Sequence, residues 1–168
     1  MRTAVSTIVL DGGSMTTVAV VAVVALGALG VAWYLSREVL AADAGTARMQ
    51  EIAGAVQEGA AAYLNRQFRT LSVFAVLVFF LLFALPATTT SERIGRSVFF
   101  LVGAVFSATT GYFGMWLAVR GNVRVAAAAR DAGEQTTMRL AFRTGGVAGM
   151  FTVGLGLFGA ALVVLVYQ

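Results

Sequence analysis

Six of the eight carboxylates of this chain, those on the side predicted below to be cytoplasmic, have the chemistry that would suit a phosphate or metal site. They are Glu38, Asp43, Glu51, Glu58, Asp131 and Glu134. Mg²⁺ is held by carboxylates, waters and substrate phosphates, so such a site needs several carboxylates close together. These six form no Asp-rich cluster, and we interpret Glu51 and Glu58 as one helix face that pairs with Arg48 or Arg66. The sequence therefore predicts no catalytic, cofactor-binding or metal-binding residue in this chain.

The residue types that are absent exclude most other catalytic chemistry. The chain has no Cys and no His, which removes disulfides, zinc and iron-sulfur sites, thiol nucleophiles and histidine acid-base catalysis. All 12 basic residues are Arg, so no Schiff-base or phosphate-loop lysine is available. Arg120 and Arg124 share a face that could attract an anion. We interpret them instead as anchors of a helix end at lipid headgroups.

The elements that carry these residues are expected to cross a membrane. Apolar residues make up 59% of the 168 residues and charged residues 12%, against about 25% charged in soluble domains. Four uncharged stretches each exceed the roughly 20 residues that cross a bilayer. The sequence predicts an all-α polytopic membrane protein, one membrane domain over residues 1–168. Its four transmembrane helices are expected at about 16–35, 70–87, 97–119 and 145–167.

The arginines predict how the chain is threaded. Nine of the 12 lie in residues 36–69 and 120–144, and only three, including Arg2, lie elsewhere. Because short cytoplasmic loops are enriched in Arg, both segments are predicted to be cytoplasmic loops of a cell-membrane protein, with both termini outside. The basic pI near 10.3 is explained by these helix ends, so no nucleic-acid partner is expected.

A signal peptide is the alternative interpretation of the first apolar stretch. Ala42, Asp43 and Ala44 could mimic a cleavage site. The preceding leader is long and nearly uncharged, and its apolar run is longer than a signal peptide needs. A transmembrane helix is therefore the favoured reading.

The segment 45–69 is predicted to be an amphipathic cytoplasmic helix that extends the second span. Its apolar face carries Met49, Ile52, Val56, Tyr63 and Leu64, and its polar face Glu51, Glu58, Asn65 and Arg69. No breaker separates it from the span at Thr70, so one helix of about 60 Å should run to Leu85, half of it in the cytoplasm. Pro86 and residues 88–91 close it, and Ser91 is the predicted N-cap of the next helix.

Small residues recur along the last two spans. The stripes are Gly103, Ser107 and Gly111, and then Gly145, Gly149, Thr152, Gly156 and Gly159. Such stripes let helix backbones approach closely in lipid, and we favour close packing over a sliding surface or a pore wall. The aromatic residues Trp33, Tyr34, Tyr112, Trp116 and Tyr167 are expected at the membrane interfaces. The uncharged runs hold no ionisable residue, so the chain alone has no ion relay.

Three stretches resemble the ion-pumping membrane-bound inorganic pyrophosphatases. Residues 49–68 are similar to the family's signature before its second helix, 107–129 to its third helix and following loop, and 140–159 to its fourth helix. The three stretches occur in the family's order. Two departures stand out, since Gly121 lies where the family usually has Ala, and Thr144 where Gly is common.

The resemblance implies a larger pump of which this chain would be helices one to four. Family members hydrolyse pyrophosphate at the cytoplasmic face with Mg²⁺, transport H⁺ or Na⁺ outward, and as complete proteins form homodimers. In the family the first four helices belong to an outer ring around the catalytic helices, so no family catalytic residue maps onto this chain. The choice between H⁺ and Na⁺ and the K⁺ dependence stay open.

The favoured function is that of the N-terminal part of a pyrophosphatase, which scaffolds the outer helices. Its partners would be the bilayer and the remaining helices on the same or another chain. A chain that ends at Gln168, at the end of a span, fits a partial protein. Two other functions compete with this one. The alternative is a self-contained four-helix membrane protein with a packing or accessory role and no enzymatic activity. A small multidrug exporter would need a membrane-embedded carboxylate, which the uncharged runs lack.

Overall fold

Four long helices make up the part of the chain that the computed structural model describes, residues 12–87 and 89–166. They are α1 (Gly12–Ala41), α2 (Ala47–Ala84), α3 (Thr90–Asp131) and α4 (Glu134–Val166). All four are long and apolar enough to cross a membrane, which confirms the predicted all-α fold with four candidate spans. Arg2, Thr88 and Tyr167, which entered the sequence predictions, lie outside the described residues.

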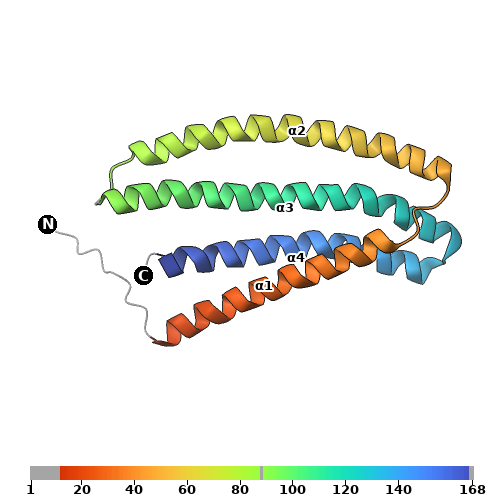
Figure 1. Cartoon of the computed structure of the whole chain (residues 1–168), viewed down its shortest axis with the longest axis horizontal. Coiled ribbons are helices and arrows are strands. Elements are labelled where there is room, and N and C mark those ends of the chain that lie inside the picture. Colours follow the sequence, from red (N-terminus) through yellow and green to blue (C-terminus); the bar gives the residue numbers. More distant parts are fainter. Residues whose placement is uncertain (1–11, 88, 167–168) are drawn as a thin grey trace.

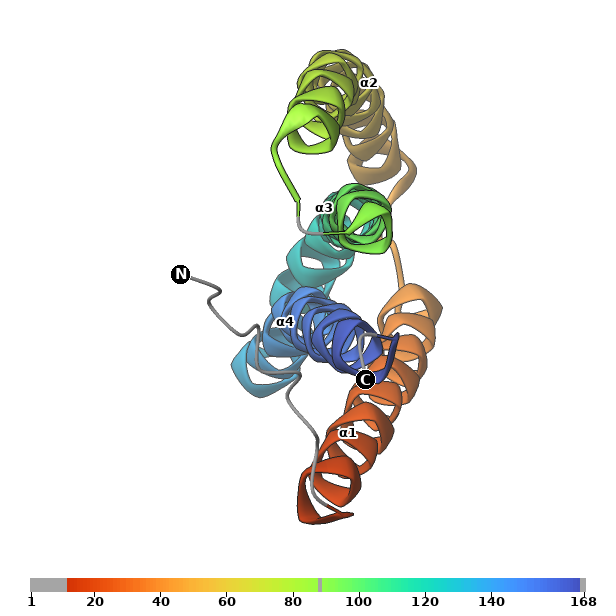
Figure 2. The same cartoon turned by 90° about the vertical axis from the view of Figure 1, so that its left-hand side faces the viewer.

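The helices stand in a row rather than in a closed bundle. Figure 2 shows the order α1, α4, α3, α2 from one side to the other, and Figure 1 shows their axes running antiparallel along the chain. α1 packs on α4, α4 on α3 and α3 on α2, while α2 contacts no described helix except α3. A row of this kind leaves wide helix faces without a protein partner within the described chain.

Two tight connections lie at the same end of the row. Between α1 and α2, Gly45 has a φ of 75° and donates its N–H to Asp43 Oδ1 at 2.9 Å, and Thr46 caps α2 by accepting from the Met49 N–H at 3.4 Å. Between α3 and α4, Gly133 has a φ of 81°, in the left-handed region that glycine adopts without strain. These connections fix where α1 and α3 end and where α2 and α4 begin.

The predicted loop 120–144 is helical almost throughout, which corrects the sequence analysis. α3 continues to Asp131 and α4 begins at Glu134. The four alanines at 126–129 are the best helix formers, and no breaker occurs before Gly133, so the chain reverses in a two-residue turn. The predicted N-cap Ser91 is also wrong by two residues. Thr89 is the N-cap, because its Oγ1 accepts from the Glu92 N–H at 3.2 Å.

α2 runs without interruption through the predicted amphipathic helix and the predicted second span. Its 38 residues give a length of about 57 Å, close to the expected length. It ends at Ala84, where the Leu85 N–H still donates to Leu81 O at 3.1 Å, just before Pro86. The cytoplasmic location of its first half stays a prediction.

The buried core is small and joins α1, α3 and α4. It consists of Ala32, Val39, Leu117, Leu140 and Val147, with Trp116 and Phe151 packed against it. In α2 the only buried residue is Ala53, while large side chains such as Phe74 and Phe80 are about 60% exposed. Most apolar surface therefore faces outward, as expected where lipid or further protein surrounds the helices.

Candidate functional site

The ends of α1, α3 and α4 meet at a cluster of charged side chains. A cavity of about 320 Å³ lies between them. Its charged lining residues are Glu38, Asp43, Arg124, Asp131, Arg139 and Arg143. The structure thus brings together three of the six carboxylates that sequence analysis singled out. Three arginines line the same cavity, so the charges balance.

Glu38 and Arg143 tie α1 to α4. Arg143 Nη1 donates to Glu38 Oε1, and both side chains are partly buried, with relative exposures of 33% and 23% for Glu38 and Arg143. The pair is separated by 105 positions in the chain, so it is a tertiary contact. A partly desolvated pair of this kind is costly to break from one side, because the remaining charge is left without its partner.

Arg124 holds the end of α1. Its Nε donates to Leu40 O at 3.3 Å and to Ala42 O at 3.2 Å, and its Nη1 donates to Arg120 O at 2.8 Å. The last carbonyls of a helix lack partners within the helix, and a cation there also opposes the helix dipole. Arg124 is therefore a helix-capping residue, and its predicted contact with lipid headgroups stays a prediction.

Arg120 keeps an interfacial arrangement. Its guanidinium lies 4.3 Å from the Trp116 ring centroid, and its Nη1 donates to Trp116 O at 3.1 Å. An arginine stacked on tryptophan is attracted by the negative ring face. Its position at the end of the uncharged run is compatible with the predicted membrane interface.

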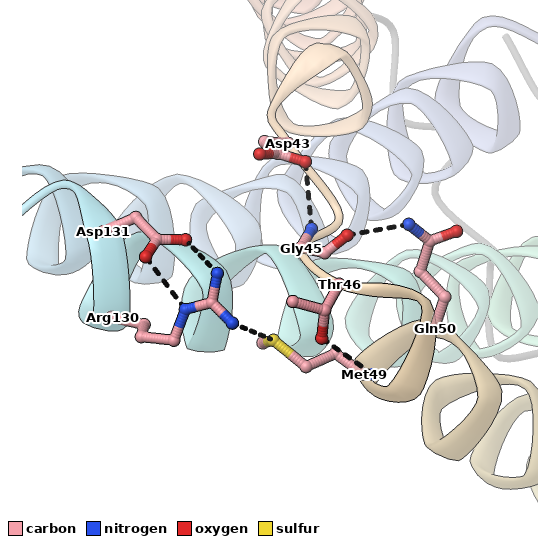
Figure 3. A network of polar contacts seen from close by, with 7 residues as sticks. All are labelled: Asp43, Gly45, Thr46, Met49, Gln50, Arg130 and Asp131. Carbon is pink, nitrogen blue, oxygen red and sulfur yellow. Dashed lines mark hydrogen bonds and ion pairs between the residues drawn. The ribbon is translucent and has the colours of Figure 1, made fainter.

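The connection between α1 and α2 lies against the end of α3. Figure 3 shows Gln50 Nε2 donating to Gly45 O, at 2.9 Å, and Arg130 pointing between Asp131 and the Met49 sulfur. The Arg130–Asp131 pair is bidentate, with both contacts at 2.8 Å. Arg130 lowers the pKa of the Asp131 carboxyl, which lies beyond the uncharged run of α3, from its ordinary value through this hydrogen bond. The network orders the connection and engages both nearby carboxylates, Asp43 and Asp131, in hydrogen bonds.

The remaining carboxylates are spread over the surface. Glu51 pairs with Arg48 at 2.6 Å, as predicted, with both side chains at least two thirds exposed. Glu58 forms no ion pair with Arg66 within the described residues. Over residues 12–87 and 89–166 no three Asp, Glu, His or Cys side chains come together as a metal site would need. The absence of catalytic residues nevertheless stays a prediction.

The two departures from the pyrophosphatase pattern touch each other. Gly121 and Thr144 are both buried where α3 crosses α4. A Cβ atom on Gly121 would lie 2.4 Å from Thr144 Cγ2 and 2.8 Å from Thr144 Oγ1. Because no Cβ fits there, the glycine makes room for the threonine, and we expect the two departures to compensate each other. Sequence analysis had weighed them separately.

Most glycines of the small-residue stripes contact no neighbouring helix within the described part of the chain. A Cβ on Gly103, Gly145, Gly149 or Gly156 would meet nothing within 4 Å among the described residues. Close approach occurs at Gly154, which lies off the stripes and where a Cβ would lie 2.8 Å from Leu29 and 3.1 Å from Ala25 O. It also occurs at Gly159, a member of the α4 stripe, where a Cβ would lie 3.2 Å from Phe106. The stripes face one another across a groove of about 590 Å³ between α3 and α4. Contact with helices outside this chain stays a prediction.

Taken together, the row of four apolar helices and its charge-balanced junction define a piece of a polytopic helical membrane protein. A family model described as "Inorganic H+ pyrophosphatase" matches residues 25–168. The chain belongs to this family, which confirms the resemblance of its three motifs.

The relatives of the chain are much longer proteins. It is 62% identical to a K(+)-insensitive pyrophosphate-energized proton pump of Streptomyces avermitilis, over 98% of this chain and 22% of the relative. A pump of the same description from Streptomyces coelicolor is 61% identical over 95% of this chain and 22% of the relative. One from Chloroflexus aurantiacus is 44% identical over 83% and 20%. The chain therefore spans about a fifth of the length of these relatives.

Proposed function

We propose that this chain forms the first four helices of a pump that couples pyrophosphate hydrolysis to outward H⁺ transport. The observation that carries the proposal is the identity of 62% and 61% to two proton pumps across nearly the whole chain. The names of these relatives favour H⁺ over Na⁺ and favour a pump that does not depend on K⁺. Within that pump the four helices scaffold the outer part of the bundle.

The chemistry of the pump belongs to residues outside this chain. Transfer of a phosphoryl group needs positioned cations and Mg²⁺ held by carboxylates. Glu38, Asp43 and Asp131 do line one cavity, but Arg124, Arg139 and Arg143 share it, and Glu38 is already paired with Arg143. These residues do not fit a site for Mg²⁺ and pyrophosphate. The remaining helices would supply that site, on the same chain or a second one, and the complete pump would act as a homodimer.

The competing hypothesis is that the chain is a self-contained four-helix membrane protein with a packing or accessory role. It would have to be stable in a membrane as an open row in which α2 rests on α3 alone among the described helices. The exposed guanidinium groups of α2 and the open grooves between helices favour a chain that meets further protein.

The test compares the chain with a complete pump. Purified residues 1–168 should show no Mg²⁺-dependent pyrophosphate hydrolysis and no pumping in proteoliposomes, whereas the protein that also contains the missing helices should show both. Hydrolysis is measured as phosphate release. Pumping is measured as a pH gradient that an uncoupler collapses. Robust hydrolysis by the isolated chain would refute the proposal, and so would a complete protein that transports Na⁺ and not H⁺.

A further inference from the structure

Two arginines of α2 have no partner in the described part of the chain. Arg66 and Arg69 are both exposed, and neither side chain makes a hydrogen bond or an ion pair there. Glu58 and Asn65 are likewise exposed, and their spacing places them on the same side of α2. That side is named here the α2 polar face: Glu58, Asn65, Arg66 and Arg69. Its depth in the membrane decides what can cover it.

The contacts between α2 and α3 fix the level of these arginines. At one end of the pair, Arg96 Nη2 donates to Leu82 O at 2.6 Å and to Leu85 O at 3.1 Å. At the other end, Arg130 reaches the Met49 sulfur. Midway, the Phe68 ring lies 3.9 Å from where a Cβ on Gly111 would be. In this antiparallel register Arg69 lies about level with Thr110, two residues from the midpoint of the uncharged run 97–119.

A second set of contacts locates the edge of the membrane. The uncharged runs of α1, α3 and α4 end together, where Glu38 pairs with Arg143 and Arg124 holds Leu40 O. On α2, Gln57 lines the same groove as Arg120 and Arg124, so Gln57 marks this edge. Arg66 and Arg69 follow it by nine and 12 residues, about 14 and 18 Å along the helix. In a hydrocarbon layer of about 30 Å both lie near its middle.

A charged side chain at that depth is costly to expose to the lipid hydrocarbon. Ionisable residues inside a membrane face the interior of a bundle or a water-filled cavity and pair with one another. From the middle of the layer an arginine is too short to reach either headgroup region. Lipid-compatible side chains of α2, such as Phe74, Leu77 and Leu81, lie further along the helix. The α2 polar face therefore needs protein that carries negative charge.

We propose that the α2 polar face is a docking surface for a transmembrane helix of the remaining pump that presents a carboxylate at the level of Arg66 and Arg69. The inference rests on the proposed function, because relatives more than four times as long supply the missing helices. It places residues 58–69, predicted to be cytoplasmic, inside the membrane. Arginine suits the contact, since its planar group pairs with a carboxylate through two hydrogen bonds.

The test uses the complete pump and measures assembly. The variant Arg66→Leu/Arg69→Leu should give roughly ten-fold less monodisperse protein after detergent extraction, because it leaves a buried carboxylate unpaired. Arg69→Glu should be at least as harmful, and Arg69→Lys should keep most of the assembly. The matched control is Arg48→Leu on the same helix, outside the membrane and paired only with the exposed Glu51, which should assemble normally.

Two results would overturn the inference. If the double leucine variant assembles as well as the unchanged pump or better, the face meets lipid, since removing charge from lipid is favourable. If Arg48→Leu lowers the amount of assembled protein equally, the loss does not depend on the depth of the arginine in the membrane. Restoration of Arg69→Glu by an acidic-to-Arg change elsewhere in the pump would support the inference and identify the partner. Because assembly is measured, a pump without pyrophosphate hydrolysis would contradict the proposed function alone.

Discussion

Gly121 and Thr144 are a packing pair that can be tested by exchange. Gly121→Ala should destabilise the protein by about 1–3 kcal/mol, because the added methyl group would overlap the Thr144 side chain in a crowded crossing. Thr144→Gly alone should cost only about 0.3 kcal/mol through helix propensity, because threonine is itself a poor helix former, and it also removes the buried threonine side chain. The double variant, which restores the pattern typical of the family, should recover most of the loss caused by Gly121→Ala.

Thermal unfolding in detergent, followed for the four proteins of this double-mutant cycle, measures the coupling between the two positions. Gly146→Ala is a control, because nothing lies within 4 Å of the added Cβ among the described residues. It should leave the midpoint of unfolding unchanged or raise it. Additive effects of Gly121→Ala and Thr144→Gly would mean that the two residues do not compensate each other.

Between helices, the crossing of α1 and α4 depends on Gly154 rather than on the stripe predicted from sequence. Gly154→Leu should sharply reduce the amount of folded protein, because its side chain would collide with Leu29 and with the backbone oxygen of Ala25. Gly145→Ala lies on the stripe, in open space, and should be tolerated. Folded yield after size-exclusion chromatography distinguishes the two. If both variants lost folded protein equally, the stripe would be a contact surface as well.

Helix identity was predictable from sequence, but helix neighbours were not. Uncharged runs and the missing breakers between Thr46 and Leu85 predicted four apolar helices and one very long one, since these features act locally. The role of Arg124 could not be predicted, because it depends on Leu40 and Ala42, more than 80 positions away. Which glycines touch a neighbour likewise depends on the rotation of each helix in the row.

The depth of Arg66 and Arg69 did leave a signal in the sequence. The uncharged run after Arg69 extends to Ser91 only if Pro86 and the turn beyond it are counted. Its helical part, from Thr70 to Ala84, is 15 residues, shorter than the roughly 20 that cross a bilayer. The difference supports the inference that α2 takes polar residues into the membrane.

For the molecule as a whole, the arrangement of arginines predicts its orientation. Because the chain has no cysteine, single cysteines can be introduced without background labelling. Thr89→Cys should react with a membrane-impermeant maleimide added outside intact cells, and Gln135→Cys, beside the turn at Gly133, should react only after the membrane is opened. Position 135 is labelled in place of position 133, because a cysteine side chain at Gly133 would be strained by the positive φ of that residue. Labelling of position 135 alone from outside would reverse the orientation.

The order of the row also bears on how the protein is made. α2 can pair with α3, and α3 with α4, as soon as each hairpin leaves the ribosome, because those neighbours follow one another in the chain. α1 packs mainly on α4, which begins 93 residues after α1 ends. At about 5–20 residues per second, α1 waits roughly 5 to 20 s in the bilayer before its main partner is synthesised. During that interval the Glu38 carboxylate lacks the Arg143 guanidinium with which it pairs in the folded chain.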